Sequence, residues 1–284
     1  MPGAETASSG REPLGHPRPR DPQVITRALM SLRLRAADLL DTVSGRRDSL
    51  TPPRRLSNYV GHGDFQATGE EFLGLFRSLA DLRPEDRVLD IGCGIGRMAR
   101  VLVPVLRPPG SYDGFDIAEA GIRWCQAHYR DTAAPFRFQH ADLYNSVYNA
   151  AGHETPSTYR FPYRDGSFDL AVATSVFTHL LADAADHYLA QAARVLAPGG
   201  RLFATWFLID EPGSPPPPFT ADPGHSPAAT ADPAAPEAAV AYPQRWLRKR
   251  LDANGFDLEA IHPGSWRGDR PGLTLQDIAV ARRR

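Results

Sequence analysis

The chain has 284 residues, of which 42% are hydrophobic and 23% charged, and its formal net charge is −1. This composition is typical of a globular protein and excludes a wholly disordered chain, while the small net charge gives no global field that would attract nucleic acid. At about 100–200 residues per domain, the length predicts one domain with appendages, and no apolar run approaches the roughly 20 residues of a membrane-spanning helix.

The first 66 residues are expected to lie outside the main domain. Residues 1–21 are rich in Pro, Gly, Ser and Arg without apolar periodicity, so we expect a disordered tail. The tail lacks the apolar segment of a secretory signal. Residues 22–66 are expected to form a helical cap or flap, because apolar residues between Val24 and Val43 recur at helical spacing. Such a helix caps an active site or forms a homodimer contact; docking on a membrane surface through its arginines is the alternative.

A glycine-rich turn follows the first predicted strand. The apolar segment Val88–Ile91 contains Asp90, and Gly92, Gly94 and Gly96 follow at alternate positions before a predicted helix. Glycine permits positive φ and lets a ligand approach the backbone closely. The start of the helix offers free N–H groups and the positive end of its dipole. The sequence therefore predicts a site for a small polar ligand at this turn.

The glycine spacing argues against two common nucleotide sites. A dinucleotide site requires Gly-x-Gly-x-x-Gly, whereas here Arg97 holds the third position and Gly96 comes one residue early. Asp90 would also lie close to a pyrophosphate. No Gly-Lys-Ser/Thr follows, so a Walker loop is excluded. A nicotinamide oxidoreductase is therefore an unfavoured interpretation.

The second and third predicted strands also end in polar residues. Ser111–Asp116 ends in a carboxylate 20 residues beyond Gly96, near the spacing at which an acidic residue binds ribose hydroxyls. The alternative is that Asp116 caps the helix that starts near Ala118. The third strand, Phe136–Gln139, runs into His140-Ala141-Asp142-Leu143.

The remaining predicted elements complete an alternating pattern of strands and helices. The apolar run of the fourth strand is typical of a strand that helices cover on both faces. The expected elements are a strand over Phe168–Thr174, a helix over Ala182–Leu196, a strand from Arg201 onward, a helix over Tyr242–Asn254, and strands over Phe256–Ile261 and Leu273–Ala281.

This series of motifs resembles the class I S-adenosylmethionine-dependent methyltransferases. The resemblance rests on Asp-x-Gly-x-Gly-x-Gly, the acidic ends of the next two strands, the loop after the fourth strand and the Leu-x-Pro-Gly-Gly turn, and it covers roughly Pro84–Trp206. It implies an α/β, Rossmann-like doubly wound seven-stranded sheet with the last strand antiparallel, plus an N-terminal helical extension. The methyltransferase domain would span residues 67–284, with ligands at the carboxyl ends of the strands.

The resemblance implies S-adenosyl-L-methionine as the cofactor. Asp116 would then bind the ribose, Asp142 the adenine amino group, and Leu143 would line the ring pocket, while the Ser175–Leu180 loop lies beneath the methionine portion. The expected cofactor-binding residues are Asp90, Gly92, Cys93, Gly94, Gly96, Arg97, Asp116, Ile117, Ala141, Asp142, Leu143, Thr174 and Ser175.

Methyl transfer to a hydroxyl also requires a group that removes a proton. His179 is the leading candidate, since it follows the fourth strand and histidine has a suitable pKa range; the alternative is a residue that bonds the backbone or packs on the cofactor. His140 is the next candidate, with a wall position beside Asp142 as its alternative. His62 is a weaker third candidate. Tyr144 and Tyr148 would shape the acceptor pocket or only pack on the surface.

Missing motifs narrow the substrate class. No Asp/Asn-Pro-Pro-aromatic run follows the fourth strand, where Thr174–Phe177 stands instead, so nothing favours DNA bases or glutamine amides as acceptors. Only Asp169 lies near the carboxylate positions of the magnesium-dependent relatives, so we expect no metal. The sequence therefore favours a small molecule as the acceptor. The resemblance implies a hydroxyl group as the most frequent acceptor in such enzymes, and so O-methylation, in secondary metabolism. The alternative is a noncatalytic or non-methylating protein of the same fold that binds the same cofactor.

Two further features concern the segment after the fifth strand and the cellular location of the protein. Residues 210–242 form a proline-rich insertion, either a mobile lid or a linker without contacts, and the composition favours the linker. The two cysteines, Cys93 and Cys125, give no disulfide framework and favour a cytoplasmic location.

Overall fold

The computed structural model describes residues 33–34, 36–45, 47–57, 63–210, 215–221 and 227–284. The chain divides into two units, residues 1–46 and 47–284. In the first unit, residues 33–34 and 36–43 are helical, and the Thr42 hydroxyl donates to the Asp38 carbonyl at 2.8 Å. The predicted tail over residues 1–21, the start of the predicted helix and His62 lie outside the described residues. Since the main unit begins at Arg47, the cap boundary at residue 66 stays a prediction.

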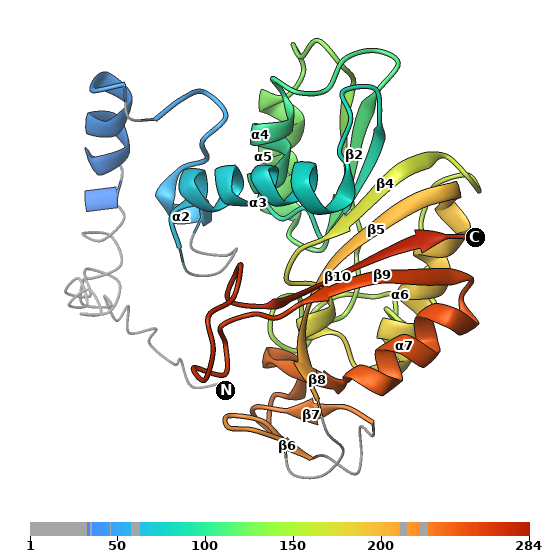
Figure 1. Cartoon of the computed structure of the whole chain (residues 1–284). Coiled ribbons are helices and arrows are strands. Elements are labelled where there is room, and N and C mark those ends of the chain that lie inside the picture. The colour runs from blue at the N-terminus through green and yellow to red at the C-terminus, as the bar shows by residue number, and fades with distance from the viewer. Residues whose placement is uncertain (1–32, 35, 46, 58–62, 211–214, 222–226) are drawn as a thin grey trace, which may run out of the picture. The chain divides into compact units, whose positions relative to one another are not determined.

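The main unit is built on a mixed sheet with the predicted architecture. Its strand order is β3-β2-β1-β4-β5, with β10 beside β5 and β9 beside β10 (Figure 1). The first five strands pair in parallel, and β10 runs antiparallel to both β5 and β9. This confirms a doubly wound sheet with an antiparallel last strand. The bounds are β1 Arg87–Ile91, β2 Ser111–Asp116, β3 Phe136–His140, β4 Phe168–Ala173, β5 Leu196–Ile209, β9 Phe256–His262 and β10 Asp277–Arg283.

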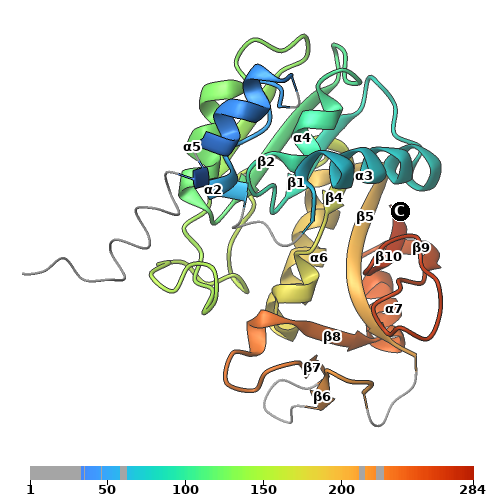
Figure 2. The ribbon, with the colours of Figure 1, turned by 90° about the vertical axis from the view of Figure 1, so that its left-hand side faces the viewer.

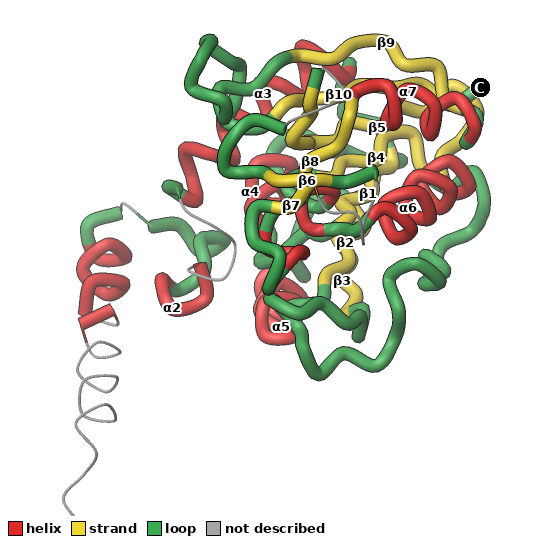
Figure 3. The backbone as a smooth tube through the Cα atoms, turned by 90° about the horizontal axis from the view of Figure 1, so that it is seen from below, coloured by secondary structure: helices red, strands yellow, loops and turns green. Residues whose placement is uncertain are grey.

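Helices cover both faces of this sheet (Figures 2 and 3). Strand residues alternate between two hydrophobic cores, as the period of two in a β-strand requires. Leu89 and Ile91 of β1 pack in the core that includes α6 and α7, whereas Val88 packs in the core that includes α3, α4 and α5. The helices are α2 Arg54–Ser57, α3 Phe65–Ala80, α4 Arg97–Leu102, α5 Glu119–His128, α6 Ala182–Val195 and α7 Gln244–Ala253.

The proline-rich insertion extends the sheet instead of leaving it. The last residues of β5, Phe207–Ile209, pair in parallel with β8 (Val240–Pro243), β7 (Ala229–Thr230) pairs with β8, and β6 (Thr220–Ala221) pairs with β7. The interpretation as a linker without contacts is therefore wrong for the described residues. The composition of the segment predicted a linker because it contains few apolar residues, but these few are enough for pairing with the edge of the sheet. Phe219, Ala229 and Ala241 of the insertion also form a small hydrophobic core with Ile209 of β5. We call residues 215–221 and 227–243 the arm.

Boundaries of three predicted elements also differ, and the strand expected from Arg201 already begins at Leu196. The helix expected from Tyr242 begins at Gln244, because Tyr242 belongs to β8 and its buried hydroxyl donates to the Leu180 carbonyl at 2.5 Å. The strand expected from Leu273 begins only at Asp277. The Asp277 carboxylate is buried and accepts hydrogen bonds from the backbone N–H groups of Gly264 and Leu208 and from the indole of Trp266, at 2.7–2.8 Å. These bonds fix where the loop ends.

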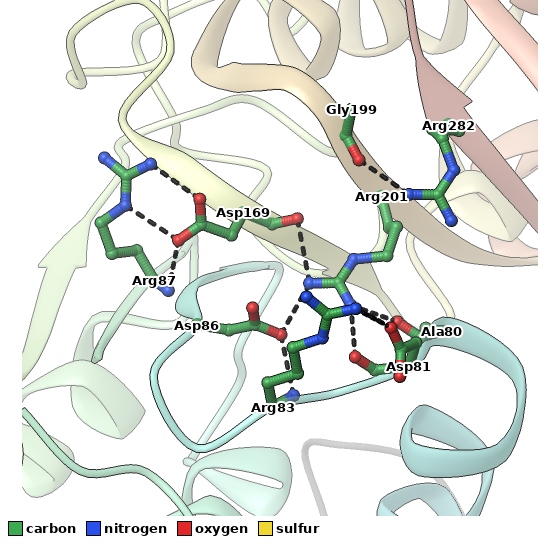
Figure 4. A network of polar contacts seen from close by, with 9 residues as sticks. All are labelled: Ala80, Asp81, Arg83, Asp86, Arg87, Asp169, Gly199, Arg201 and Arg282. Atoms are coloured by element: carbon green, nitrogen blue, oxygen red, sulfur yellow. Dashed lines mark hydrogen bonds and ion pairs between the residues drawn. The ribbon is translucent and has the colours of Figure 1, made fainter. Parts of the chain in front are cut away.

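A buried ion pair lies at the amino-terminal edge of the parallel strands (Figure 4). Arg201 donates to the Asp86 carboxylate at 2.7 Å, and the two side chains are only 7% and 8% exposed. Arg201 also donates to the backbone carbonyls of Ala80, at 2.9 Å, and Asp81, while the Arg83 N–H donates to Asp86 at 2.9 Å. The pair therefore joins the end of α3 to the start of β1 and to β5.

Beside this buried pair, Arg87 and Asp169 form a second, partly exposed ion pair at the same edge of the sheet. The Arg87 guanidinium donates to both carboxylate oxygens of Asp169, at 2.9 and 2.8 Å. Asp169, the acidic residue that came nearest to a metal-binding pattern in the sequence, thus serves to join β1 to β4.

Arg201→Met should lower the free energy of unfolding by about 3–5 kcal/mol, because it leaves the buried Asp86 charge without its partner. Urea denaturation followed by circular dichroism measures this loss. Arg123→Met is the control, since Arg123 forms an exposed pair with Glu119 within α5, and such pairs contribute about 0.5 kcal/mol or less. Equal losses in the two variants would contradict the importance assigned to the buried pair.

Candidate functional site

The turn between β1 and α4 has the backbone that its glycines predict. Gly92, Gly94 and Gly96 have φ values of 73°, 56° and 82°, in the left-handed region that favours glycine. A Cβ at Gly92 would lie 2.4 Å from Cγ2 of Val176, so no other residue fits there without movement. The turn is joined to β2, since the N–H groups of Gly92 and Cys93 donate to the Phe115 carbonyl at 2.9 and 3.0 Å.

Asp116 joins this turn to the next one. Its Oδ2 accepts the N–H of Gly94 at 2.8 Å, and its Oδ1 accepts the N–H of Ala118 at 2.7 Å. The second bond reaches Ala118, which itself occupies the N-cap position of α5, so Asp116 is not the cap residue of that helix that was considered as the alternative. Burial raises the pKa of Asp116 above its usual value, although these N–H groups and the nearby His140 oppose the rise. Each carboxylate oxygen retains a lone pair for a further donor.

Asp90 is the most deeply buried acid of the site. Its side chain is fully buried, and Oδ2 accepts the hydroxyl of Tyr112 at 2.6 Å. Oδ1 is buried without a hydrogen-bond partner. Burial raises the pKa of Asp90 to about 7, the Tyr112 hydrogen bond opposes this rise, and the charge of Asp116 adds to it. An unpartnered carboxylate oxygen of this kind favours a cationic or hydrogen-bond-donating ligand group.

A cavity of about 260 Å³ opens beside these residues, at the carboxyl ends of β1 and β4. This is the crevice where the strand order reverses and where open α/β sheets bind ligands. It brings together the predicted residues Asp90, Gly92, Cys93, Gly94, Arg97, Thr174 and Ser175, and it is also lined by Thr68, Glu71, Phe72, Met98, Thr274, Leu275 and Gln276.

The second set of lining residues was absent from the sequence prediction. Thr68, Glu71 and Phe72 share one face of α3 at i, i+3 and i+4 spacing, which is a signal that could have been used. Thr274–Gln276 gave no such signal, because the alternation of polar and apolar residues in β10 continues back through them and predicted that they belong to the strand.

Ser175 shapes one wall of the cavity with a strained backbone. Its φ of 57° is positive although it is not a glycine, and such strain is concentrated at functional sites. Its N–H donates to Thr205 Oγ1 at 2.7 Å, and its hydroxyl donates to Gln276 Oε1 at 3.0 Å. Thr205 also donates to Gln276, at 2.6 Å. These bonds hold the loop after β4 against the loop before β10.

Arg97 supplies positive charge to the cavity. Its guanidinium lies over the ring of Phe65, 5.8 Å from the ring centroid. Burial lowers the pKa of Arg97, and the charge of Asp64 opposes that change. The cavity thus presents acidic side chains, from Asp90 and Glu71, together with one cation.

The predicted residues after β3 lie outside the lining of this cavity. Ala141 and Leu143 are each 1% exposed and pack in the core beneath the sheet edge, so Leu143 does not line an open pocket as expected. The Asp142 carboxylate accepts Nδ1–H of His153 at 2.6 Å, and this bond lowers the pKa of Asp142. The ring of His140 bonds the Ile117 carbonyl through Nε2 at 3.2 Å, which fits a wall position.

His179 lies on the short 3₁₀ helix η1 (Phe177–His179) after β4, outside the lining of the cavity. Its Nδ1 bonds the backbone carbonyl of Glu237 at 3.0 Å, and the ring of Tyr148 meets its ring edge-on at 5.1 Å. Burial lowers the pKa of His179, and hydrogen bonds to the backbone at Glu237 and Ala238 oppose that change. Burial therefore favours the neutral form of the imidazole.

Among the described residues, no group of three or more His, Cys, Asp or Glu side chains is placed to hold a metal ion. No helix within the described ranges has the length and apolar character needed to cross a membrane.

Known proteins resemble this chain across its central part. Residues 89–202 match a family described as a methyltransferase domain. The 27-O-demethylrifamycin SV methyltransferase of Amycolatopsis mediterranei is 31% identical over 186 residues, which cover 61% of this chain and 56% of that protein. The fatty-acid O-methyltransferase of Mycolicibacterium smegmatis is 33% identical over 119 residues, which cover 42% of this chain and 36% of that protein.

A solved structure supports the fold. The magnesium protoporphyrin IX methyltransferase ChlM of Synechocystis PCC 6803, crystallised with bound SAH, has a TM-score of 0.51 and 16% sequence identity to this chain. The similarity covers 81% of this chain and 93% of that one. The chain spans between about a third and just over half of the length of the first curated relatives that it matches.

The raised pKa of Asp90 predicts a pH-dependent stability. Because the folded pKa, about 7, exceeds the usual 3.8, Asp90 destabilises the fold progressively as the pH rises from about 4 to above 7, by on the order of 4 kcal/mol. Asp90→Asn cannot ionise, so its free energy of unfolding should fall less between pH 5 and pH 8.5 than that of the wild type. Urea denaturation at both pH values tests this, and parallel losses in the two proteins would contradict the assignment.

Proposed function

We propose that the chain is a class I S-adenosylmethionine-dependent methyltransferase and that it transfers a methyl group from S-adenosylmethionine to a hydroxyl group of a small apolar molecule. One observation carries this proposal. Asp90, whose buried Oδ1 has no hydrogen-bond partner, lines a cavity beside a glycine turn that the Asp116 carboxylate binds.

The cavity residues fit the amino-acid portion of the cofactor. The ammonium group would satisfy Asp90 Oδ1, with Glu71 as a second acid nearby, and the carboxylate would face Arg97. The positive φ of Gly92 and its lack of a side chain leave the backbone accessible on the same side. Opposite charges are thus available for both ends of a zwitterion.

The nucleoside portion would lie toward the ends of β2 and β3. The Asp116 oxygens can each accept a further hydrogen bond, from a ribose hydroxyl. The adenine would meet Asp142, whose Oδ1 has only a long contact of 3.4 Å to Asn149. Since the side chains of Ala141 and Leu143 are buried, they would meet the ring only through their backbone.

Exposed apolar side chains support an apolar acceptor. Among the described residues of the main unit, the large hydrophobic side chains that are exposed lie on two loops at the carboxyl edge of the sheet, and they are Tyr144, Val147, Tyr148, Leu273 and Leu275. The two loops thus offer exposed apolar side chains at the edge of the sheet that carries the glycine turn. The names of the relatives agree, since one is a fatty-acid O-methyltransferase and another acts on 27-O-demethylrifamycin SV.

When bound, the cofactor supplies a methyl group on a sulfonium, which an acceptor displaces in line. The protein must hold the acceptor hydroxyl in position, exclude water and take up its proton. We assign the proton to Nε2 of His179, because the Glu237 carbonyl occupies Nδ1. The two buried, free cysteines support the cytoplasmic location proposed for this reaction.

Methyl transfer can be tested directly with cofactor labelled in the methyl group. Hydroxylated fatty acids and aromatic polyketides would be compared with sugars and short peptides as acceptors, and products identified by mass spectrometry. The proposal predicts label on oxygen in an apolar acceptor. Cofactor binding without transfer to any acceptor would favour a noncatalytic binding protein, and transfer only to polar acceptors would contradict the apolar class.

His179→Gln should lower kcat about 10²-fold or more with little change in cofactor affinity, since general bases contribute roughly 10²–10⁴-fold. The measurement is steady-state kinetics with the acceptor identified above, together with calorimetric titration of S-adenosylhomocysteine. His262→Gln, on the edge strand β9, is the matched control and should retain wild-type rates. Unchanged kcat in His179→Gln would remove His179 from the mechanism.

A further inference from the structure

Glu237 of the arm makes two separate contacts, one with the η1 segment and one with the loop after β3. Glu237 belongs to the short 3₁₀ helix η3 (Pro236–Ala238). Its backbone carbonyl accepts a hydrogen bond from Nδ1 of His179 at 3.0 Å. Its side-chain Oε2 accepts the backbone N–H of Ser146 at 2.6 Å. A single residue of the insertion therefore joins the loop after β3 to the segment after β4.

We propose that Glu237 is a positioning residue, which selects the tautomer of His179 and holds the loop over residues 144–149 beside its ring. This inference deepens the proposed function and rests on the assignment of His179 as the group that takes the acceptor proton. It gives the proline-rich insertion a defined part in the site.

The contact at Nδ1 decides which ring nitrogen is basic. A backbone carbonyl can only accept a hydrogen bond, so Nδ1 of His179 must carry the hydrogen. In a neutral imidazole the other nitrogen, Nε2, then keeps its lone pair. Burial favours the neutral ring. The titratable groups that face this ring are the Glu237 carboxylate from the arm and the Tyr148 phenol from the loop.

The hydrogen bond from Ser146 to Glu237 joins the exposed loop over residues 144–149 to the arm. Within the loop, Asn145 Oδ1 accepts the N–H groups of Val147 and Tyr148 at 3.0 and 2.9 Å, and its Nδ2 donates to the His179 carbonyl at 3.4 Å. Glu237 accepts the N–H of Ser146, which lies between Asn145 and Val147 in this loop. The loop therefore presents the edge of the Tyr148 ring to His179, with the two ring centroids 5.1 Å apart.

The arm can hold this position because it is itself fixed to the core. β8 pairs with β5 from Ala241 onward, only four residues after Glu237, and the Tyr242 hydroxyl donates to the carbonyl of Leu180, the neighbour of His179. The backbone on both sides of the contact is thus tied to buried elements. A free linker could not fix a tautomer in this way.

Nuclear magnetic resonance of the full-length protein without ligands tests the inference independently of activity. Two-bond ¹H–¹⁵N couplings distinguish the two imidazole tautomers, and His179→Gln identifies the signals. We expect His179 to be the Nδ1–H tautomer in the wild type and in Glu237→Gln, whose amide oxygen can still accept the Ser146 N–H. Glu237→Ala keeps the backbone carbonyl but loses the side-chain bond to Ser146 that holds this carbonyl in place, so it should show a mixture of tautomers.

Kinetics give the second measurement. Glu237→Ala should lower kcat about tenfold and shift the pH profile of kcat, while Glu237→Gln should restore kcat to within about twofold of the wild type. Glu154→Ala is the control, because it removes an equal charge from the same loop region, where Glu154 makes only backbone hydrogen bonds. It should keep wild-type kinetics and couplings.

The outcomes separate the two claims. Wild-type couplings of His179 in Glu237→Ala would overturn the positioning role, and so would an equal loss of kcat in Glu154→Ala. A changed tautomer in a protein that transfers no methyl group would support the positioning role while contradicting the proposed function.

Discussion

The carboxylate of Asp116 is the interaction on which the ligand edge depends. It lies at the end of β2 and accepts N–H groups from two separate turns, at Gly94 and Ala118. Without it, the glycine turn would have a buried polar N–H without an acceptor, which costs about 1–3 kcal/mol. The same side chain therefore holds the glycine backbone in its left-handed conformation and leaves oxygen lone pairs at the edge where a ligand binds. Structural and binding requirements coincide in one residue.

Charge is used differently at the two edges of the sheet. At the amino edge, Arg201 and Asp86 are buried but fully paired, so they fix the packing of α3 against the sheet. At the carboxyl edge, Asp90 is equally buried, yet one of its oxygens has no partner and its pKa is raised to about 7. A buried carboxylate oxygen is thus left without a hydrogen-bond partner at the edge where a ligand would supply one, as expected of a binding site.

The sequence predicted the central sheet well because strong local signals coincide there. The apolar run of β4 and the glycine turn after β1 are each decided by a few adjacent residues. The arm was mispredicted because β8 gains its hydrogen bonds from β5, some thirty residues away, and composition carries no trace of such pairing. The contact between His179 and Glu237 was hidden for the same reason, since it spans 58 residues of sequence.

The account stands on the cavity beside Asp90 and Asp116 as the cofactor site, and calorimetric titration of S-adenosylhomocysteine tests that most directly. We expect binding in the micromolar range by the wild type, loss of at least tenfold in Asp116→Ala, and retention in Asp113→Ala, whose carboxylate on the same strand contacts Arg137 instead. NADH should not bind. Absence of S-adenosylhomocysteine binding, or binding of NADH in its place, would contradict the account and leave only the fold.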